Sequence, residues 1–163
     1  MKKAMVSLFA VLLLLLCACS PAQSGTVTFF YPRAEIVYDQ PDGVIASESR
    51  NTTGHTLDTG YLVSLYLMGP MSQKLSPAFP QSTDLISYTQ SGGKLQLNLT
   101  DTAEAMTDSA FALSCACLAR TCVQGLGVEE VTVSSGARTL TLRDNMLLTY
   151  DEPFPETTVE DTK

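Results

Sequence analysis

An uncharged apolar run near the N-terminus limits which part of the chain can form the folded domain. The run covers residues 4–18 and follows Lys2 and Lys3. As a helix, its fifteen residues would measure about 22 Å, whereas the hydrocarbon core of a bilayer is about 30 Å thick. A basic start, a short apolar stretch and then small and polar residues are typical of an export signal. We therefore predict that residues 1–18 are a signal peptide and that the fold lies in the other 145 of the 163 residues.

The apolar run ends in two cysteines. The sequence Leu16-Cys17-Ala18-Cys19 resembles the lipid-attachment sequence of bacterial lipoproteins, in which a leucine lies three residues before the modified cysteine and a small residue lies directly before it. Cys19 fits this pattern, whereas Cys17 would have the bulky Leu16 at the cleavage position. The resemblance implies cleavage before Cys19, a diacylglycerol on its thiol, and therefore membrane lipid as a partner. The alternative is an ordinary secretory signal with an incidental cysteine pair.

The net charge of the chain excludes one class of partner. It is −7 for the whole sequence and becomes −9 after removal of residues 1–18, because Lys2 and Lys3 are lost. With no surplus of lysine and arginine to replace phosphate counterions, binding to nucleic acid is not expected. Anionic lipid would repel such a chain weakly, so the lipid anchor must hold it on the membrane. We expect a lipid-anchored protein on the extracytoplasmic face of the cell membrane.

Alternating apolar positions predict the strands. A hairpin is expected around Gly92-Gly93, and its second arm alternates leucines with polar residues, which predicts a sheet with one buried and one solvated face. A second hairpin is expected around Gly136, and further strands at 26–31 and 44–50. Residues flanking these elements predict a flexible tether at 19–25 and a disordered acidic tail at 144–163.

Two stretches have the periodicity of helices. Residues 56–70 repeat apolar side chains every three or four positions, with Thr56 as the expected N-cap and Gly69-Pro70 as the end. Residues 107–124 form the second, with Thr107 as the N-cap and Gly125 or Gly127 after the last turn.

All three cysteines that follow Cys19 lie in the second helix. Cys115 and Cys122 would be about 10 Å apart along the axis, and a disulfide allows only about 7 Å between Cα atoms. Cys115 and Cys122 share the predicted apolar face, whereas Cys117 falls outside it and is expected to be exposed. We predict no disulfide within the chain. Neither do we predict a metal site, because thiolates in this spacing diverge and the single histidine, His55, is distant in sequence.

We find no catalytic motif in the sequence. His55 lies in a polar loop without an accompanying nucleophile, and Asp101 and Glu104 fit a helix-capping arrangement better than a pair of catalytic carboxylates. No glycine-rich nucleotide loop is present. We therefore expect no catalytic residue, no cofactor and no small-molecule substrate.

The residues that end or precede the predicted elements follow a specific order. A strand ends at Tyr31-Pro32, a helix ends in "LYLMGP", Pro80 lies shortly before a strand, and "GVEEVTVSSG" follows a long helix. Together these features resemble the sporulation and spore-germination (GerMN) domain, over residues 26–143. The resemblance implies an α/β (α+β) fold in which two helices pack on one face of a small mixed sheet, as in ring-building domains. It also implies that Gly69, Pro70 and Pro80 are structural positions of the family.

The resemblance further implies an envelope lipoprotein and not an enzyme. We expect its GerMN-like domain to bind another envelope protein through a sheet edge or a helix face, in a sporulation-linked, germination-linked or general assembly role. Two alternatives remain open at this point. One is a cell-wall or small-ligand enzyme with an unrecognised site, and the other is redox regulation through a disulfide that joins two chains at Cys117.

Overall fold

The computed structural model describes residues 25–35 and 43–143. The predicted signal peptide, the lipid-attachment residue Cys19 and the acidic tail lie outside these ranges, as does the predicted tether apart from Gly25. The predicted strands and helices all lie within the described residues.

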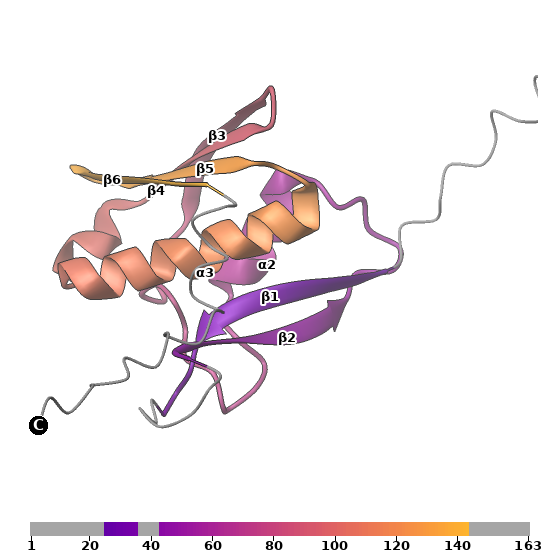
Figure 1. The fold of residues 1–163 in the computed structure, drawn as a ribbon, viewed down its shortest axis with the longest axis horizontal. Helices are drawn as coiled ribbons and strands as arrows, with labels where there is room; N and C mark the ends of the chain where they lie inside the picture. The colour runs from indigo at the N-terminus through magenta and orange to yellow at the C-terminus, as the bar shows by residue number, and fades with distance from the viewer. Residues whose placement is uncertain (1–24, 36–42, 144–163) are drawn as a thin grey trace, which may run out of the picture.

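The predicted elements all form, in the predicted order (Figure 1). The helix expected at 56–70 is shorter, because Asp58 and not Thr56 caps it by accepting a hydrogen bond from the backbone N–H of Tyr61. Thr107 and Gly127 cap the longer helix as expected, with Gly127 in the left-handed region at φ 67°. The strands are β1 (Thr26–Pro32), β2 (Ile45–Asn51), β3 (Leu85–Ser91), β4 (Lys94–Leu99), β5 (Glu130–Ser135) and β6 (Arg138–Arg143), and the helices are α2 (Thr59–Leu67), the 3-10 helix η1 (Asp101–Ala105) and α3 (Asp108–Leu126).

The strands of the described ranges form two sheets. One is mixed, in the order β3-β4-β5-β6, with β4 and β5 parallel and the outer pairs antiparallel. The parallel pair requires a crossover connection, which η1 and α3 provide. The other sheet is the antiparallel pair β1-β2. Figure 1 shows α2 and α3 on one face of the four-stranded sheet, with β1-β2 on the far side of the helices. The mixed α+β fold is confirmed, while the separate β1-β2 sheet was not expected.

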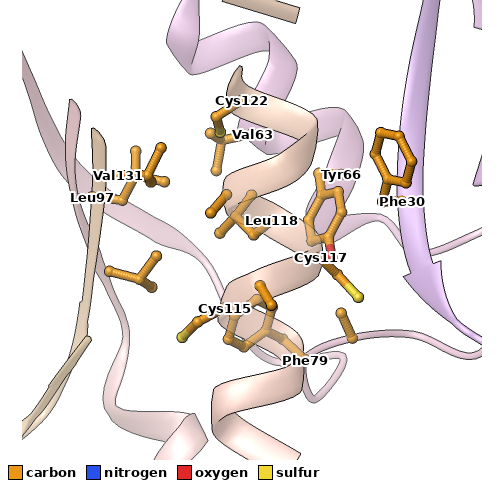
Figure 2. Close-up of a cluster of buried hydrophobic side chains, with 14 of the residues drawn as sticks. Phe30, Val63, Tyr66, Phe79, Leu97, Cys115, Cys117, Leu118, Cys122 and Val131 are labelled. Atoms are coloured by element: carbon orange, nitrogen blue, oxygen red, sulfur yellow. The ribbon is translucent and has the colours of Figure 1, made fainter. Parts of the chain in front are cut away.

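This layering changes the predicted surface of α3. A helix between two sheets is covered on both sides, so its buried face extends well beyond the predicted stripe. Cys117 is fully buried, and the prediction that it is exposed is wrong. Figure 2 shows Cys115 on the side of the four-stranded sheet and Cys117 on the side of β1 and Tyr66. The three described cysteines are free thiols.

A hydrogen bond joins α3 directly to the backbone of β1. The backbone N–H of Phe30 donates to Thr121 Oγ1 at 3.0 Å, and the Arg120 guanidinium lies 4.4 Å from the centre of the Phe30 ring. Thr121 is polar but buried, and its hydroxyl accepts a hydrogen bond from the edge of β1 that faces away from β2.

Candidate functional site

Four large apolar side chains are exposed in the part of the chain that the structure describes, and they mark two surfaces. Met68 and Met71 flank Gly69-Pro70 and are 80% and 81% exposed, while Ile86 and Tyr88 on β3 are 61% and 47% exposed. Exposed apolar groups that gather on one element are a common feature of interaction surfaces.

Strand β3 forms an open edge of the four-stranded sheet. Its sequence, LISYTQS, contains no charged residue and no proline. Those are the residues that usually prevent another strand from pairing with an edge. The opposite edge, β6, differs because it begins with Arg138 and ends with Arg143. By residue type, the β3 edge is thus the less protected of the two, and its one irregularity is the β-bulge between Leu85 and Ser87.

Helix α2 holds β3 in place. The Thr59 hydroxyl at the start of α2 donates to Gln90 Oε1 at 2.8 Å. At Gly60, an added Cβ would lie 3.5 Å from a ring carbon of Tyr88, so this ring lies close to the helix backbone. Side chains alternate along a strand, so Tyr88 and Gln90 share the helix-side face, whereas Ile86 lies in a β-bulge between Leu85 and Ser87 that interrupts the alternation. The Tyr88 side chain therefore lies at the border between the open edge and α2, and the exposed Ile86 lies at the bulge of the same edge.

The Gly69-Pro70 loop is fixed by Arg50 of β2. Gly69 has φ +86°, a conformation that other residues rarely adopt, and its carbonyl oxygen accepts from Arg50 Nη2 at 2.6 Å. Arg50 Nη1 donates to the carbonyl oxygen of Leu65 in the last turn of α2 at 2.8 Å. One guanidinium therefore satisfies carbonyl groups at the end of the helix and in the adjoining loop.

Glu48 completes the attachment of this loop. It lies 2.6 Å from Arg50 Nη2, and the two side chains are only 12% and 9% exposed. Glu48 also accepts from the backbone N–H groups of Met71 and Ser72, at 3.0 and 2.9 Å. Desolvation alone would raise the pKa of Glu48, but the hydrogen bonds from Met71, Arg50 and Ser72 and the charge of Arg50 hold it below the usual value. Met68 and Met71 thus project from a backbone held on both sides.

Two stacked tyrosines lie beneath the ion pair. The rings of Tyr31 and Tyr66 are 4.7 Å apart and nearly parallel. The Tyr31 hydroxyl donates to the Tyr66 carbonyl oxygen and accepts from Arg50 Nη2, each at 2.9 Å. Burial raises the pKa of Tyr31 to about 12. The buried Tyr66 hydroxyl finds no hydrogen-bond partner among the described residues.

The residues predicted as family positions occupy two turns. Gly69 and Pro70 lie in the loop that Arg50 and Glu48 hold, and Pro80 lies in the turn before β3, where its carbonyl oxygen accepts from the backbone N–H of Thr83 at 2.9 Å. Arg50 was missed at the sequence level. Its signal was the pair Glu48 and Arg50, two opposite charges two residues apart and so on one face of a strand.

The other candidate residues are scattered. His55 is exposed and stacks on Tyr61 with ring centres 4.9 Å apart. The capping role expected for Asp101 and Glu104 is wrong, because Thr100 precedes η1 and makes no side-chain capping bond, while Glu104 accepts from the backbone N–H of Ala137 at 3.4 Å. Within residues 25–35 and 43–143, no group of three or more histidine, cysteine, aspartate or glutamate side chains is placed to hold a metal ion.

Comparison with known proteins adds one structural likeness. No family model and no curated protein matches the chain, so the GerMN resemblance stays a prediction. A 2.5 Å crystal structure from Clostridium perfringens, provisionally described as that of a lipoprotein, is similar with a TM-score of 0.46 and 17% sequence identity. The match covers 78% of this chain and 94% of that chain.

Proposed function

We propose that this protein is a membrane-anchored envelope lipoprotein whose folded domain binds an extended segment of another envelope protein at the β3 edge. The observation that carries this proposal is the open, uncharged β3 edge with Ile86 and Tyr88 exposed beside it. The GerMN resemblance supports an assembly role and suggests sporulation or germination as its setting. The lipoprotein resemblance at Cys19 supports the anchor.

The chemistry of a sheet edge explains how such a partner would bind. An added strand pairs its backbone with the free N–H and C=O groups of the edge, which gives affinity, and alternate side chains enter neighbouring pockets, which gives specificity. On β3, the exposed apolar side chains are Ile86 in the bulge and Tyr88 on the helix side, so the partner would need apolar side chains opposite these two positions. The arginines at the two ends of β6 make that edge a poorer acceptor.

A lysine at the β3 edge tests the site. We expect Ile86→Lys to reduce the yield of the crosslinked partner from intact envelopes at least tenfold, because the charge would be desolvated under an added strand. Ser49→Lys is the matched control, since it places the same charge on an exposed strand position of the other sheet and should leave the yield unchanged. Equal crosslinking by both variants, or no reproducible partner for the wild type, would contradict the proposal.

The anchor has its own test. Cys19→Ala should abolish incorporation of radiolabelled palmitate and release the protein from the membrane fraction, because the acylated thiol is lost. Cys17→Ala is the control and should label normally, since a leucine three residues before Cys19 and the small Ala18 both remain. Palmitate labelling of Cys19→Ala would show that the lipid-attachment residue lies elsewhere.

A further inference from the structure

The outer face of the four-stranded sheet, opposite α2 and α3, is polar, and its charged side chains are confined to one end. No described element covers it (Figure 1). The strand registers align its outward side chains in three rows. Two of these rows contain only hydroxyl and carboxamide side chains. They are Ser87, Asn98, Ser134 and Thr139 in one row, and Thr89, Gln96, Thr132 and Thr141 in the next.

The third row is ionic and balances its own charge. Glu130 lies between Lys94 at 3.1 Å and Arg143 at 2.9 Å. Hydrogen bonds from Arg143 and Lys94 hold the pKa of Glu130 below its usual value, so it stays ionised between them. These charges lie at one end of the face. The two uncharged rows therefore have no ionised side chain of their own in an otherwise acidic chain.

The uncharged rows surround a shallow hollow of about 200 Å³. Tyr88 and Leu97 contribute backbone to it, because the Leu97 side chain is buried on the helix side and the Tyr88 ring lies against Gly60. Side chains supply the rest of the lining. They are Ser87, Thr89, Gln96, Asn98 and Ser134.

The polar groups on the two sides of this hollow differ in their partners. On β5 and β6, the hydroxyls pair with one another, Ser134 with Thr139 at 3.0 Å and Thr132 with Thr141 at 2.9 Å. On β3 and β4, the outward side chains of the uncharged rows form no side-chain hydrogen bond within the described ranges. They are Ser87, Thr89, Gln96 and Asn98. Each carboxamide offers two N–H donors and a carbonyl acceptor, and each hydroxyl can both donate and accept.

We propose that this hollow binds a neutral glycan that carries hydroxyl and acetamide groups. A phosphate or carboxylate ligand would need arginine or lysine in the lining, and none is present. An apolar ligand would need apolar side chains, which lie on the other face. Sugar hydroxyls and acetamide groups can both donate hydrogen bonds to and accept them from the carboxamides of Gln96 and Asn98.

The affinity of one site is small. Four uncharged side chains, each forming a modest hydrogen bond, correspond to a Kd on the order of 1 mM. The hollow is also smaller than the typical range of about 300–1,000 Å³ for ligand sites, so it covers a small part of a long glycan. Many membrane-anchored copies facing one polymer would bind it far more tightly than a single copy through multivalency.

The test uses the full chain in a detergent without a sugar head group, since glycosidic detergents would compete. Saturation-transfer NMR with chitohexaose, an oligomer of N-acetylglucosamine, should show binding, and cellohexaose, its counterpart without acetamides, should bind at least fivefold more weakly. The double variant Gln96→Glu with Asn98→Asp loses both amide donors and should bind chitohexaose at least tenfold more weakly. Thr141→Val changes the same sheet face outside the hollow and should bind normally.

Each outcome has a distinct meaning. Pelleting of the wild type with purified peptidoglycan, lost in the double variant, supports the site with the wall polymer as its ligand. Chitohexaose binding without pelleting supports the site with soluble oligosaccharides as the ligand. No signal with chitohexaose, or equal binding by the double variant, overturns the proposal. Ile86→Lys leaves the hollow intact and should still bind chitohexaose, which separates this site from the β3 edge.

Discussion

Arg50→Met is expected to lower the free energy of unfolding by about 3 kcal/mol, the lower end of the range for a buried ion pair, because the pair is largely buried and Glu48 keeps its two backbone donors. The variant keeps most of the apolar volume but leaves Glu48 without its cation and the carbonyl oxygens of Leu65 and Gly69 without their donor. The cation-π contact with Phe29, at 4.6 Å from the ring centre, is also lost. Urea unfolding followed by far-UV circular dichroism gives the free energy directly.

Arg143→Met is the matched control for this measurement. Arg143 pairs with Glu130 of the neighbouring strand, but Arg143 is 65% exposed and Glu130 keeps Lys94 as a second cation, so its loss should change the unfolding midpoint much less. Equal midpoints for the two variants would show that the Arg50 contacts do not stabilise the fold.

The ion pair also makes stability depend on pH in one direction. The pKa of Glu48 is lower in the folded protein than in the unfolded chain, so its contribution is complete above the unfolded value of about 4.3 and is lost as the pH falls through the folded value. Glu48→Gln should therefore flatten the part of the stability curve that lies below about pH 5.

Cys115, Cys117 and Cys122 are expected to resist alkylation in the folded protein. Burial raises the pKa of each thiol from 9.0 to about 12, so the reactive thiolate fraction at pH 8 is about a thousandfold smaller than for an ordinary cysteine. A short pulse of iodoacetamide, followed by peptide mass spectrometry, should find all three unmodified in buffer and all three modified in denaturant.

The behaviour of Cys117 decides the redox alternative. A disulfide between two folded chains requires an accessible thiol, and Cys117 lies between α3, β1 and Tyr66 with no exposed surface. Modification of Cys117 in buffer, while Cys115 stays protected, would show that α3 separates from β1. A disulfide between two chains at Cys117 would then be possible again. Slow and equal modification of all three would instead report global unfolding.

The local elements were predictable because their signals are local. The hairpins around Gly92-Gly93 and Gly136 carry turn residues that favour positive φ, and all three glycines show it, at 56° for Gly92, 75° for Gly93 and 57° for Gly136. Thr107 and Gly127 likewise mark the ends of α3 through capping alone. Such features depend on a few neighbouring residues and not on the rest of the fold.

The arrangement of the elements was less predictable. Nothing in the sequence of β1 shows that it pairs only with β2 and then packs against the side of α3, and this contact is what buries Cys117. The ion pair between Glu48 and Arg50 acquires its role only when the Gly69-Pro70 loop folds over it.

The candidate sites divide in the same way. Gly69 and Pro70 were identified from the motif at the end of a helix, whereas the open β3 edge follows from the strand order, which depends on long-range pairing. The uncharged rows of the outer face form only when four strands pair in one register, and two of those strands, β4 and β5, are separated in sequence by the whole of α3. Periodicity predicts which face of one strand is wet, but not which wet side chains become neighbours.

Helix α3 is long and apolar enough to cross a membrane by length and composition, yet it lies in the core of this domain. Two buried hydroxyls, on Ser114 and Thr121, favour the position of α3 in the core of the domain over a position in a bilayer. Each contacts the carbonyl oxygen four residues earlier, as such residues do in lipid, but each also bonds to another element, the carbonyl of Ala78 and the N–H of Phe30. A bilayer offers neither partner, so these two residues bias the helix toward its own domain.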